Sequence, residues 1–222
     1  MRCITQRIRA IDDNEKAARR QSILDAAKAL FLEDTSGLPS VISIARKAGL
    51  AKGTVYLYFK TKEEIFLAIL AEDYEILMVE VIALLDNPSS PDELVNKLIS
   101  TLICFLDKNP RFMPLASMAS PVLEQNVDIE IVGQFKLMLA NKINQIDEHF
   151  LLAFPHFNKG QCGSLLLHTN ALILGLWQMQ NWPEKLKPLL DQFPFNTVVP
   201  DFKKDLTLSL RNLWKGALSN SH

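Results

Sequence analysis

Apolar residues recur at helical spacing along most of this chain of 222 residues. Near the amino end they mark one face of a helix at the i, i+3, i+4 and i+7 positions. The residues concerned are Ala18, Ile23, Ala26, Ala27, Leu30 and Phe31. The face begins near Asn14 or Glu15, where a polar cap and acidic neighbours suit a helix start. The stretch 35–39 holds Gly37 and Pro39, which disfavour continuation, so we predict that the first helix ends there.

Two short helices and a long one follow in quick succession. We expect them at residues 41–48, 52–59 and 62–85. Ser40 is suited to cap the first of them, and Gly49 to end it with a left-handed residue. Thr61 is suited to cap the long helix, whose first turn carries two acidic residues.

A Pro- and Ser-containing break at residues 86–91 separates this region from further helical patterns. We expect helices at 92–107, 123–152, 161–180 and 201–218, a looser stretch at 110–121, a connector at 155–160 and a short helical turn at 184–192. The segment 161–180 is apolar on nearly every side, which indicates burial on more than one face. The fold class predicted by these patterns is all-α.

Composition places the chain among folded proteins: 48% of its residues are hydrophobic and 22% charged. Its three cysteines are too few and too scattered for a disulfide framework, which favours a reducing compartment. We find no signal-peptide pattern and no apolar run of the ~18–20 residues that a membrane span needs. We therefore expect a soluble cytoplasmic protein.

The net charge of −1 hides an uneven distribution. Residues 1–62 hold twelve basic and six acidic residues, a balance of +6, which leaves −7 for the other 160 residues. A basic segment on an acidic body is expected of a module that meets a polyanion such as DNA. A chance difference between the two parts is the plain alternative.

A sharper pattern lies inside the basic segment, in residues 41–59. Ala45 is small, Gly49 follows four residues later, and Val55 six residues after that. This spacing is typical of a helix-turn-helix, in which the second helix crosses over the small residue and enters the major groove of DNA. An ordinary corner between two helices has similar offsets. On the second helix Val55 and Phe59 are expected to point inward, which leaves Lys52, Thr54, Tyr56 and Tyr58 for DNA.

Three stretches around this corner resemble the TetR family of transcriptional regulators. They are Ile23-Leu24-Asp25-Ala26-Ala27 with Leu30-Phe31, then Ile44-Ala45-Arg46-Lys47-Ala48-Gly49, then Lys52-Gly53-Thr54-Val55-Tyr56-Leu57-Tyr58-Phe59-Lys60-Thr61-Lys62-Glu63-Glu64. The resemblance covers about residues 15–75. The remaining two thirds match the family only in being long and helical.

The resemblance implies a set of DNA contacts. We assign them to Ser40, Arg46, Lys52, Gly53, Thr54, Tyr56, Tyr58 and Lys62. Ser40 and Lys62 stand where the family contacts phosphates. The chain departs from the family pattern at Thr35-Ser36, Pro39 and Ala51, where the family usually has Gly followed by an aromatic residue, Thr and Ser, respectively.

We expect four parts: an N-terminal extension 1–14, a three-helix DNA-binding domain 15–62, a connecting helix 63–85, and a ligand-binding and dimerisation domain 86–222. The extension is either a disordered arm that reaches DNA or an irregular terminus.

Apolar, thioether and aromatic residues of the C-terminal part suit a pocket between helices. Our ligand-binding candidates are Phe105, Met113, Met118, Met138, His168, Trp177 and Gln178, and Phe112, Phe135, Asn170 and Met179 belong to the same group. Plain core packing is the alternative for each of them. A homodimer is expected through helices at 164–180 and 201–217, with Leu206, Leu210, Leu213 and Trp214 in the contact, unless these helices pack within one subunit.

Other classes of function have weaker support. The four histidines show no i, i+4 pair and there is no Cys-x-x-Cys, so we expect no metal and no cofactor. Nothing orients Cys104 or Cys162 as a nucleophile with His168, and we expect no enzyme. The sequence favours a repressor that binds a palindromic DNA operator as a dimer and is released by an unidentified small apolar effector. An activator of the same architecture, and a ligand sensor or enzyme whose helix-turn-helix is only structural, stay open.

Overall fold

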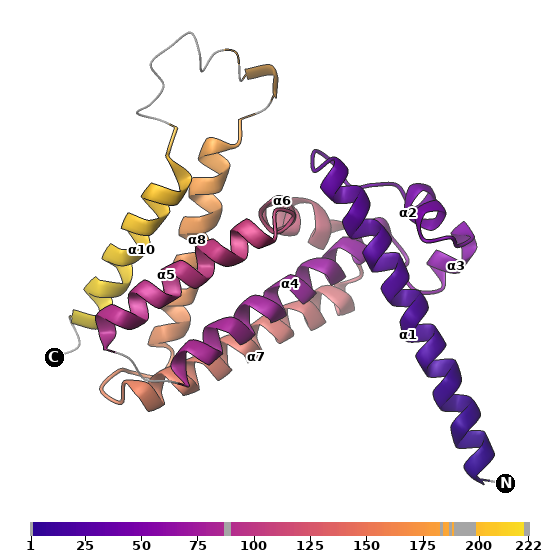
Figure 1. Ribbon diagram of the computed structural model, residues 1–222, viewed down its shortest axis with the longest axis horizontal. Helices are drawn as coiled ribbons and strands as arrows, with labels where there is room; N and C mark the ends of the chain where they lie inside the picture. The colour runs from indigo at the N-terminus through magenta and orange to yellow at the C-terminus, as the bar shows by residue number, and fades with distance from the viewer. Residues whose placement is uncertain (1, 87–89, 183, 187, 189–198, 220–222) are drawn as a thin grey trace. The chain divides into compact units, whose positions relative to one another are not determined.

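The computed structural model describes residues 2–86, 90–182, 184–186, 188 and 199–219, with the side chains of residues 2–13, 184 and 219 left out. Throughout the described residues every regular element is a helix (Figure 1). The all-α prediction is therefore confirmed.

Contacts divide the chain into two compact units. The N-terminal unit comprises Met1–Glu72 and Met118–Phe135, and the C-terminal unit comprises Asp73–Ser117 and Lys136–His222. Helices α4 (Lys62–Leu85) and α7 (Ile129–Ala153) each contribute residues to both units. Segment 118–135, which we had placed in the ligand-binding domain, thus belongs to the unit that carries the helix-turn-helix.

Helix α1 (Arg2–Glu33) begins earlier than the start at Asn14 or Glu15 that we expected. Its sequence holds no Gly and no Pro, so nothing in the backbone stops the helix from extending toward the amino end. It ends before Gly37 and Pro39, as predicted.

The predicted corner is present. Helix α2 (Val41–Lys47) is capped by Ser40, whose Oγ accepts the Ser43 N–H at 3.1 Å. Gly49 then adopts a left-handed φ of +68°. Helix α3 (Lys52–Tyr56) is shorter than the predicted 52–59.

Two hydrogen bonds fix the start of α4. The Lys60 N–H, which precedes the helix, donates to Glu64 Oε2 in its first turn at 2.7 Å. The N–H of Glu64 donates to Thr61 Oγ1 at 3.1 Å, so Thr61 caps α4 as predicted.

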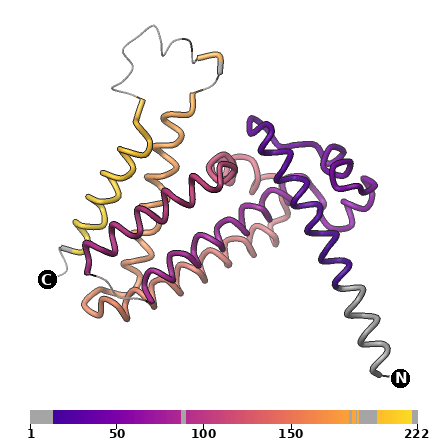
Figure 2. Tube along the Cα trace, viewed as in Figure 1, coloured from indigo at the N-terminus to yellow at the C-terminus, as the bar shows by residue number. Residues whose placement is uncertain are grey.

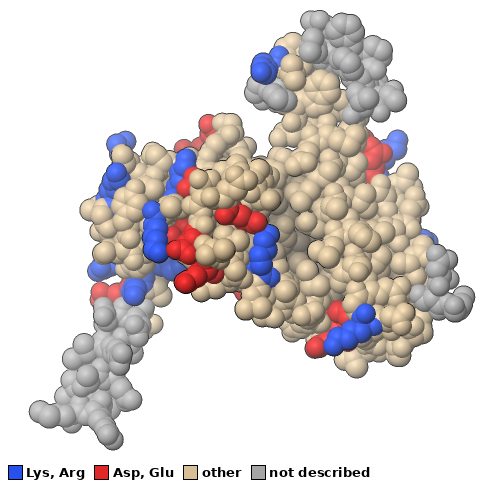
Figure 3. All heavy atoms as spheres, turned by 180° about the vertical axis from the view of Figure 1, so that it is seen from behind, with Lys and Arg blue, Asp and Glu red and all other residues tan. Residues whose placement is uncertain are grey.

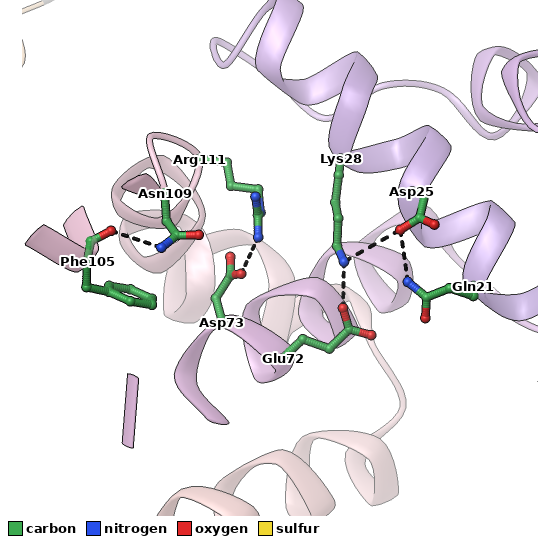
Figure 4. Close-up of polar contacts among 8 residues, drawn as sticks. All are labelled: Gln21, Asp25, Lys28, Glu72, Asp73, Phe105, Asn109 and Arg111. Atoms are coloured by element: carbon green, nitrogen blue, oxygen red, sulfur yellow. Dashed lines mark hydrogen bonds and ion pairs between the residues drawn. The ribbon is translucent and has the colours of Figure 1, made fainter. Parts of the chain in front are cut away.

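Aromatic and aliphatic side chains from α1, α2, α3 and α4 form the core of the N-terminal unit. The core residues without exposed surface include Ile23, Leu24, Ala27, Phe31, Ile44, Val55 and Phe66. The rings of Phe31 and Phe66 lie 5.4 Å apart. Two ion pairs link helices of this unit. Lys28 on α1 pairs with Glu72 on α4 at 2.7 Å, as Figure 4 shows, and Lys47 on α2 pairs with Glu33 on α1 at 2.6 Å.

We predicted a helix from residue 123 onward, but α7 begins only at Ile129. The preceding residues form a π-helical turn (Ala119–Leu123) and a 3₁₀ turn (Glu124–Asn126) after α6 (Phe112–Met118). Asp128 explains the late start, since its carboxylate accepts the Glu130 N–H at 3.1 Å and so caps α7.

The C-terminal unit is built around α10 (Phe202–Ser219), which packs against both α5 (Pro91–Lys108) and α8 (Gln161–Gln180) (Figure 2). Leu206, Leu210 and Trp214 are buried within the chain, and Trp214 Nε1 donates to Thr169 Oγ1 at 2.9 Å. Our expectation that these three residues form a subunit contact is therefore wrong, because they face the chain's own core.

Buried Asp147 holds the start of α8. Its carboxylate accepts the N–H groups of Gly160 and Gly163 at 2.7 and 3.4 Å, and Gly160 has a φ of +84°. The short turn that we expected at 184–192 is present as a 3₁₀ turn at Glu184–Leu186, and residues 187 and 189–192 lie outside the described residues.

Replacing Gly49 by Ala should loosen the corner. No heavy atom lies within 4 Å of the position that a Cβ would take, so the cost comes from the left-handed backbone alone, about 1–2 kcal/mol. We expect protection of the α2 and α3 amides against hydrogen exchange to fall about 5- to 30-fold. Gly53→Ala is the control: it has equal space but a helical backbone, and should not lower protection. Equal losses in both variants would contradict this account.

Candidate nucleic-acid interface and ligand cavity

All eight residues that we assigned to DNA lie in the N-terminal unit, and none is fully buried. Five are exposed and three are half-buried: Ser40, Arg46, Lys52, Gly53 and Tyr56 in the first group, Thr54, Tyr58 and Lys62 in the second. The outer face of α3 is thus available to a ligand as large as DNA.

The inner face of α3 fixes that presentation. Val55 has no exposed surface, Ala45 on α2 is 3% exposed, and Phe59 is 4% exposed. The guanidinium carbon of Arg20, on α1, lies 5.2 Å from the centre of the Phe59 ring. Because the inward residues are locked in the core, the outward residues of α3 keep a fixed direction.

Two of the outward residues also touch each other. The Lys52 ammonium lies 5.6 Å from the centre of the Tyr56 ring, within reach of a cation–π contact. Lys62, at the first position of α4, has a side chain that is 40% exposed. Lysines at these places can reach phosphate oxygens, whereas the Tyr56 hydroxyl can donate to a phosphate or a base edge.

Our assignment from sequence left out two exposed apolar residues of the corner. Leu57 is 80% exposed and Ile42 is 53% exposed. The signal for Leu57 was present: it lies two residues from both Val55 and Phe59, which point inward, so it has to point out. An exposed leucine beside Tyr56 can contact thymine methyl groups.

Charged side chains are distributed unevenly over the surface. On the face drawn in Figure 3, charged side chains are frequent on the N-terminal unit and sparse on the C-terminal unit. Exposed basic residues of the N-terminal unit are Lys16, Arg19, Arg20, Arg46, Lys47, Lys52 and Lys60. Such a surface attracts a polyanion without regard to its sequence.

The C-terminal unit contains an apolar cavity of about 50 Å³, against the ~10–15 Å³ that one water molecule needs. Its walls come from α4, α5, α6 and α8, and consist of Tyr74, Leu77, Met78, Val81, Leu102, Phe105, Leu106, Phe112, Leu166, Thr169, Asn170 and Ile173. Phe112 packs edge-on against both Tyr74 and Phe105, with ring centres 5.1 and 5.2 Å apart. The aromatic rings therefore form one rigid side of the cavity.

Of the seven candidate ligand residues, Phe105 lines this cavity. Met113 is buried elsewhere, Met138 and Trp177 are half-buried, and His168 and Gln178 are exposed on α8. Met118 belongs to the N-terminal unit. The structure does not gather these residues into one site, and ligand contacts by the other six stay predictions. Sequence reasoning missed Tyr74, Leu77 and Met78 because α4 had been taken only as a connector.

The cysteines give no sign of a nucleophile. Cys162 is buried, and burial, with a smaller contribution from the nearby Asp147 carboxylate, raises the pKa of its thiol to about 12. A thiol with so high a pKa stays protonated near neutral pH and reacts slowly. Cys104 and His168 are both exposed.

Comparison with known families agrees with this geometry. Residues 23–69 match the family described as bacterial regulatory proteins, tetR family, and residues 71–221 match the tetracyclin repressor-like C-terminal domain. The chain belongs to the TetR family. TetR-family proteins are DNA-binding transcriptional regulators, and the corner in residues 41–59 lies within the matched segment 23–69.

Known proteins match this chain in part. The fatty acid metabolism regulator protein of Bacillus subtilis is 40% identical over 58 residues, which is 26% of this chain and 30% of that protein. The nucleoid occlusion factor SlmA of Vibrio campbellii is 23% identical over 135 residues, 60% of this chain and 68% of that one. The chain thus spans less than a third of the first of these relatives, in a single well-matched segment.

Solved structures of the family share the fold over nearly the whole chain. The fatty acid degradation regulator FadR of Bacillus halodurans superposes with a TM-score of 0.57 at 16% identity, covering 91% of this chain and 95% of that one. A TetR regulator of Rhodococcus sp. RHA1 gives 0.55 at 19% identity, covering 93% and 98%. Among the helices that the structure describes, none is long and apolar enough to cross a membrane.

Lys62→Gln should weaken binding to all duplex DNA, because it removes one phosphate contact. We expect the slope of log affinity against log salt to become about 1 unit shallower for specific and random duplexes alike. Leu57→Ser should instead change the preference between sequences and leave the salt slope unchanged. Lys97→Gln, on the C-terminal unit, is the control for loss of a lysine. Identical behaviour of the Lys62 and Leu57 variants would refute this division of roles.

The cysteines should differ in reactivity. In a Cys3→Ser variant at pH 8, we expect Cys104 to react with a thiol reagent within minutes, and Cys162 only after denaturation. The raised pKa keeps the Cys162 thiol protonated at this pH, and burial blocks access to it. The reaction is followed by absorbance of the released reagent. Release of two equivalents from the folded protein would contradict the burial of Cys162.

Proposed function

We propose that this TetR-family regulator is a homodimeric repressor, which binds a palindromic operator and is released from it by a small apolar effector. The observation that carries the proposal is the exposed outer face of α3, from Lys52 to Leu57, held in place by buried Val55. The eight predicted DNA residues are part of the same proposal.

A single corner of this size offers few contacts to base edges. Dimeric helix-turn-helix proteins double them by placing two recognition helices one turn of DNA apart, on two half-sites of a palindrome. Occupancy of such an operator is enough to block transcription, so no further activity of the chain is needed for repression.

Exposed residues of α8 and α10 support dimerisation through these helices. Leu167 is 59% exposed, Met179 53% and Leu208 54%, although the opposite faces of both helices are buried. Ser164, Leu167, His168, Ala171 and Gln178 recur at helical spacing on the outer side of α8. Two copies related by a twofold axis can bury this face in a four-helix contact. We therefore assign the subunit contact to these exposed residues of α8 and α10, and no longer to the buried Leu206, Leu210 and Trp214.

The cavity supports the effector part of the proposal. Helix α4 carries Lys62 at its start and cavity residues Tyr74, Leu77 and Met78 further along. An effector that binds one conformation more tightly shifts the population toward it by its differential affinity. Because α4 lines the cavity and contributes residues to both units, a change at the cavity can act on the DNA-binding unit through this helix. Two proteins similar to this chain are named as regulators of fatty acid metabolism or degradation, which is consistent with an aliphatic effector.

A gel shift with the DNA that flanks the chain's own gene tests the proposal. A specific band that random duplex of equal length does not compete away supports it, and no specific band would refute it.

Leu208→Glu should separate the dimer, because it places a charge in the proposed contact. We expect a monomer at micromolar concentration by analytical ultracentrifugation, and an operator affinity at least tenfold lower. Leu152→Glu is the matched control, since Leu152 is 81% exposed and lies on α7, outside the proposed contact. A Leu208 variant that remains dimeric would place the subunit contact elsewhere.

A further inference from the structure

A segment from the middle of the chain brings acidic residues into the N-terminal unit. Residues 118–135 hold Glu124, Asp128 and Glu130 and no basic residue. Residues 1–72, the other part of this unit, hold twelve basic and nine acidic residues, an excess of three positive charges. The segment therefore cancels the formal positive charge of the unit that is proposed to meet DNA.

Two contacts hold this segment beside the start of α4. Thr61 Oγ1 donates to the Asn126 carbonyl at 3.3 Å, and the Lys60 ammonium lies 3.6 Å from Asp128 Oδ2. Lys60 stands two residues before Lys62, the phosphate contact that we assigned to the first position of α4. Asp128 thus lies next to the part of the corner that is proposed to contact phosphates.

The backbone of Lys60 is fixed, whereas its side chain is free to turn. Its N–H donates to Glu64 Oε2 at 2.7 Å, but 75% of its side chain is exposed. The separation of 3.6 Å from Asp128 is longer than a hydrogen bond. In the same unit Lys47 and Glu33 approach to 2.6 Å. An exposed and long ion pair contributes little to stability, so Lys60 can exchange Asp128 for another anion.

The carboxylate of Asp128 has two neighbours. Its Oδ1 accepts the Glu130 N–H at 3.1 Å and so caps α7, whereas its Oδ2 faces Lys60. Because the cap does not involve Lys60, the carboxylate keeps its place when the ammonium turns away. A DNA phosphate that takes Lys60 therefore replaces an anion that remains nearby and repels it.

We infer that Lys60 is a further DNA-contacting residue and that Asp128 competes with DNA phosphate for its ammonium. In the free protein Lys60 pairs with Asp128. In the DNA complex the ammonium pairs with a phosphate, while Asp128 continues to cap α7. Asp128 thereby lowers the affinity for all DNA sequences by the same factor. This inference rests on the proposed function, because it adds one residue to the proposed DNA contacts and one residue that opposes them.

Asp128→Asn tests the competition, because asparagine can still cap α7 but carries no charge. Binding of the full-length protein to a random 24-base-pair duplex is measured by fluorescence anisotropy. At about 50 mM salt we expect the affinity to rise about two- to fivefold, the range for loss of one exposed ion pair. The gain should disappear toward about 0.5 M salt, because salt screens interactions between exposed charges.

Lys60→Gln separates competition for Lys60 from a general effect of charge. This variant loses one phosphate contact, so the slope of log affinity against log salt should become about 1 unit shallower. Glu130→Gln is the matched control, since it removes an exposed negative charge two residues from Asp128. With Lys60 present, Asp128→Asn should raise the affinity at least twofold more than Glu130→Gln does.

In the Lys60→Gln background the two acidic substitutions should have equal effects, because the partner for which Asp128 competes is gone. An equal gain from Asp128→Asn with and without Lys60 would overturn the inference. A gain no larger than that of Glu130→Gln, or an unchanged salt slope in the Lys60 variant, would also overturn it.

The random duplex keeps this test separate from the proposed operator. If the gel shift shows no specific band but the random duplex responds as expected, the operator is refuted and the roles of Lys60 and Asp128 stand. If a specific band forms and the Lys60 and Asp128 variants bind like the unaltered protein, this inference is refuted and the repressor proposal stands. An unaltered protein that binds neither DNA refutes both.

Discussion

Helix α4 contributes residues to both units of this chain, so the structure of each unit depends on it. Its continuous backbone carries Lys62 in its first turn, the buried Asp73 at the boundary of the two units, and the cavity residue Tyr74 immediately after it. A helix resists stretching and bending because each turn is tied to the next by hydrogen bonds. The ion pair between Asp73 and Arg111 ties this part of α4 to the turn between α5 and α6.

Within the N-terminal unit the tight corner imposes its own constraint. Gly49 has to be left-handed, Ala45 has to be small, and Val55 has to fill the angle between α2 and α3. These three requirements leave α3 with one buried and one exposed face, so its direction is fixed before DNA is present. The contacts of the segment before α7 add to this: Thr61 Oγ1 donates to the Asn126 carbonyl at 3.3 Å, and Lys60 lies 3.6 Å from Asp128. A part of the chain far along the sequence thus packs beside the start of α4.

Several buried polar groups of the C-terminal unit form hydrogen bonds across its helices. Asp147 accepts two backbone N–H groups at the start of α8, and Trp214 donates to Thr169. Buried groups of this kind destabilise a protein when they are left without partners, so they define how α7, α8 and α10 fit together. The bond between Tyr74 and Asn170, at 3.3 Å, lies in the wall of a cavity.

Local patterns in the sequence determined the helices, their caps and the DNA-binding corner. Ser40, Gly49 and Thr61 act within four residues of their own position, so their roles can be predicted without knowing the rest of the fold. The inward positions of Val55 and Phe59 follow from the same short-range spacing. The late start of α7 was missed because Asp128, which caps it, interrupts an otherwise helical pattern.

Contacts between residues distant in sequence were decided by the tertiary structure. An apolar residue on an amphipathic helix can face a core, a cavity or a second subunit. The hydrophobic pattern of the sequence is the same in all three cases. Leu206 and Leu210 turned out to face the core, Leu167 and Leu208 the solvent, and Tyr74 a cavity next to Asn170, 96 residues away. The helix-turn-helix could be predicted from the sequence because its geometry is local, whereas the cavity forms only when α4, α5, α6 and α8, which are distant in sequence, come together.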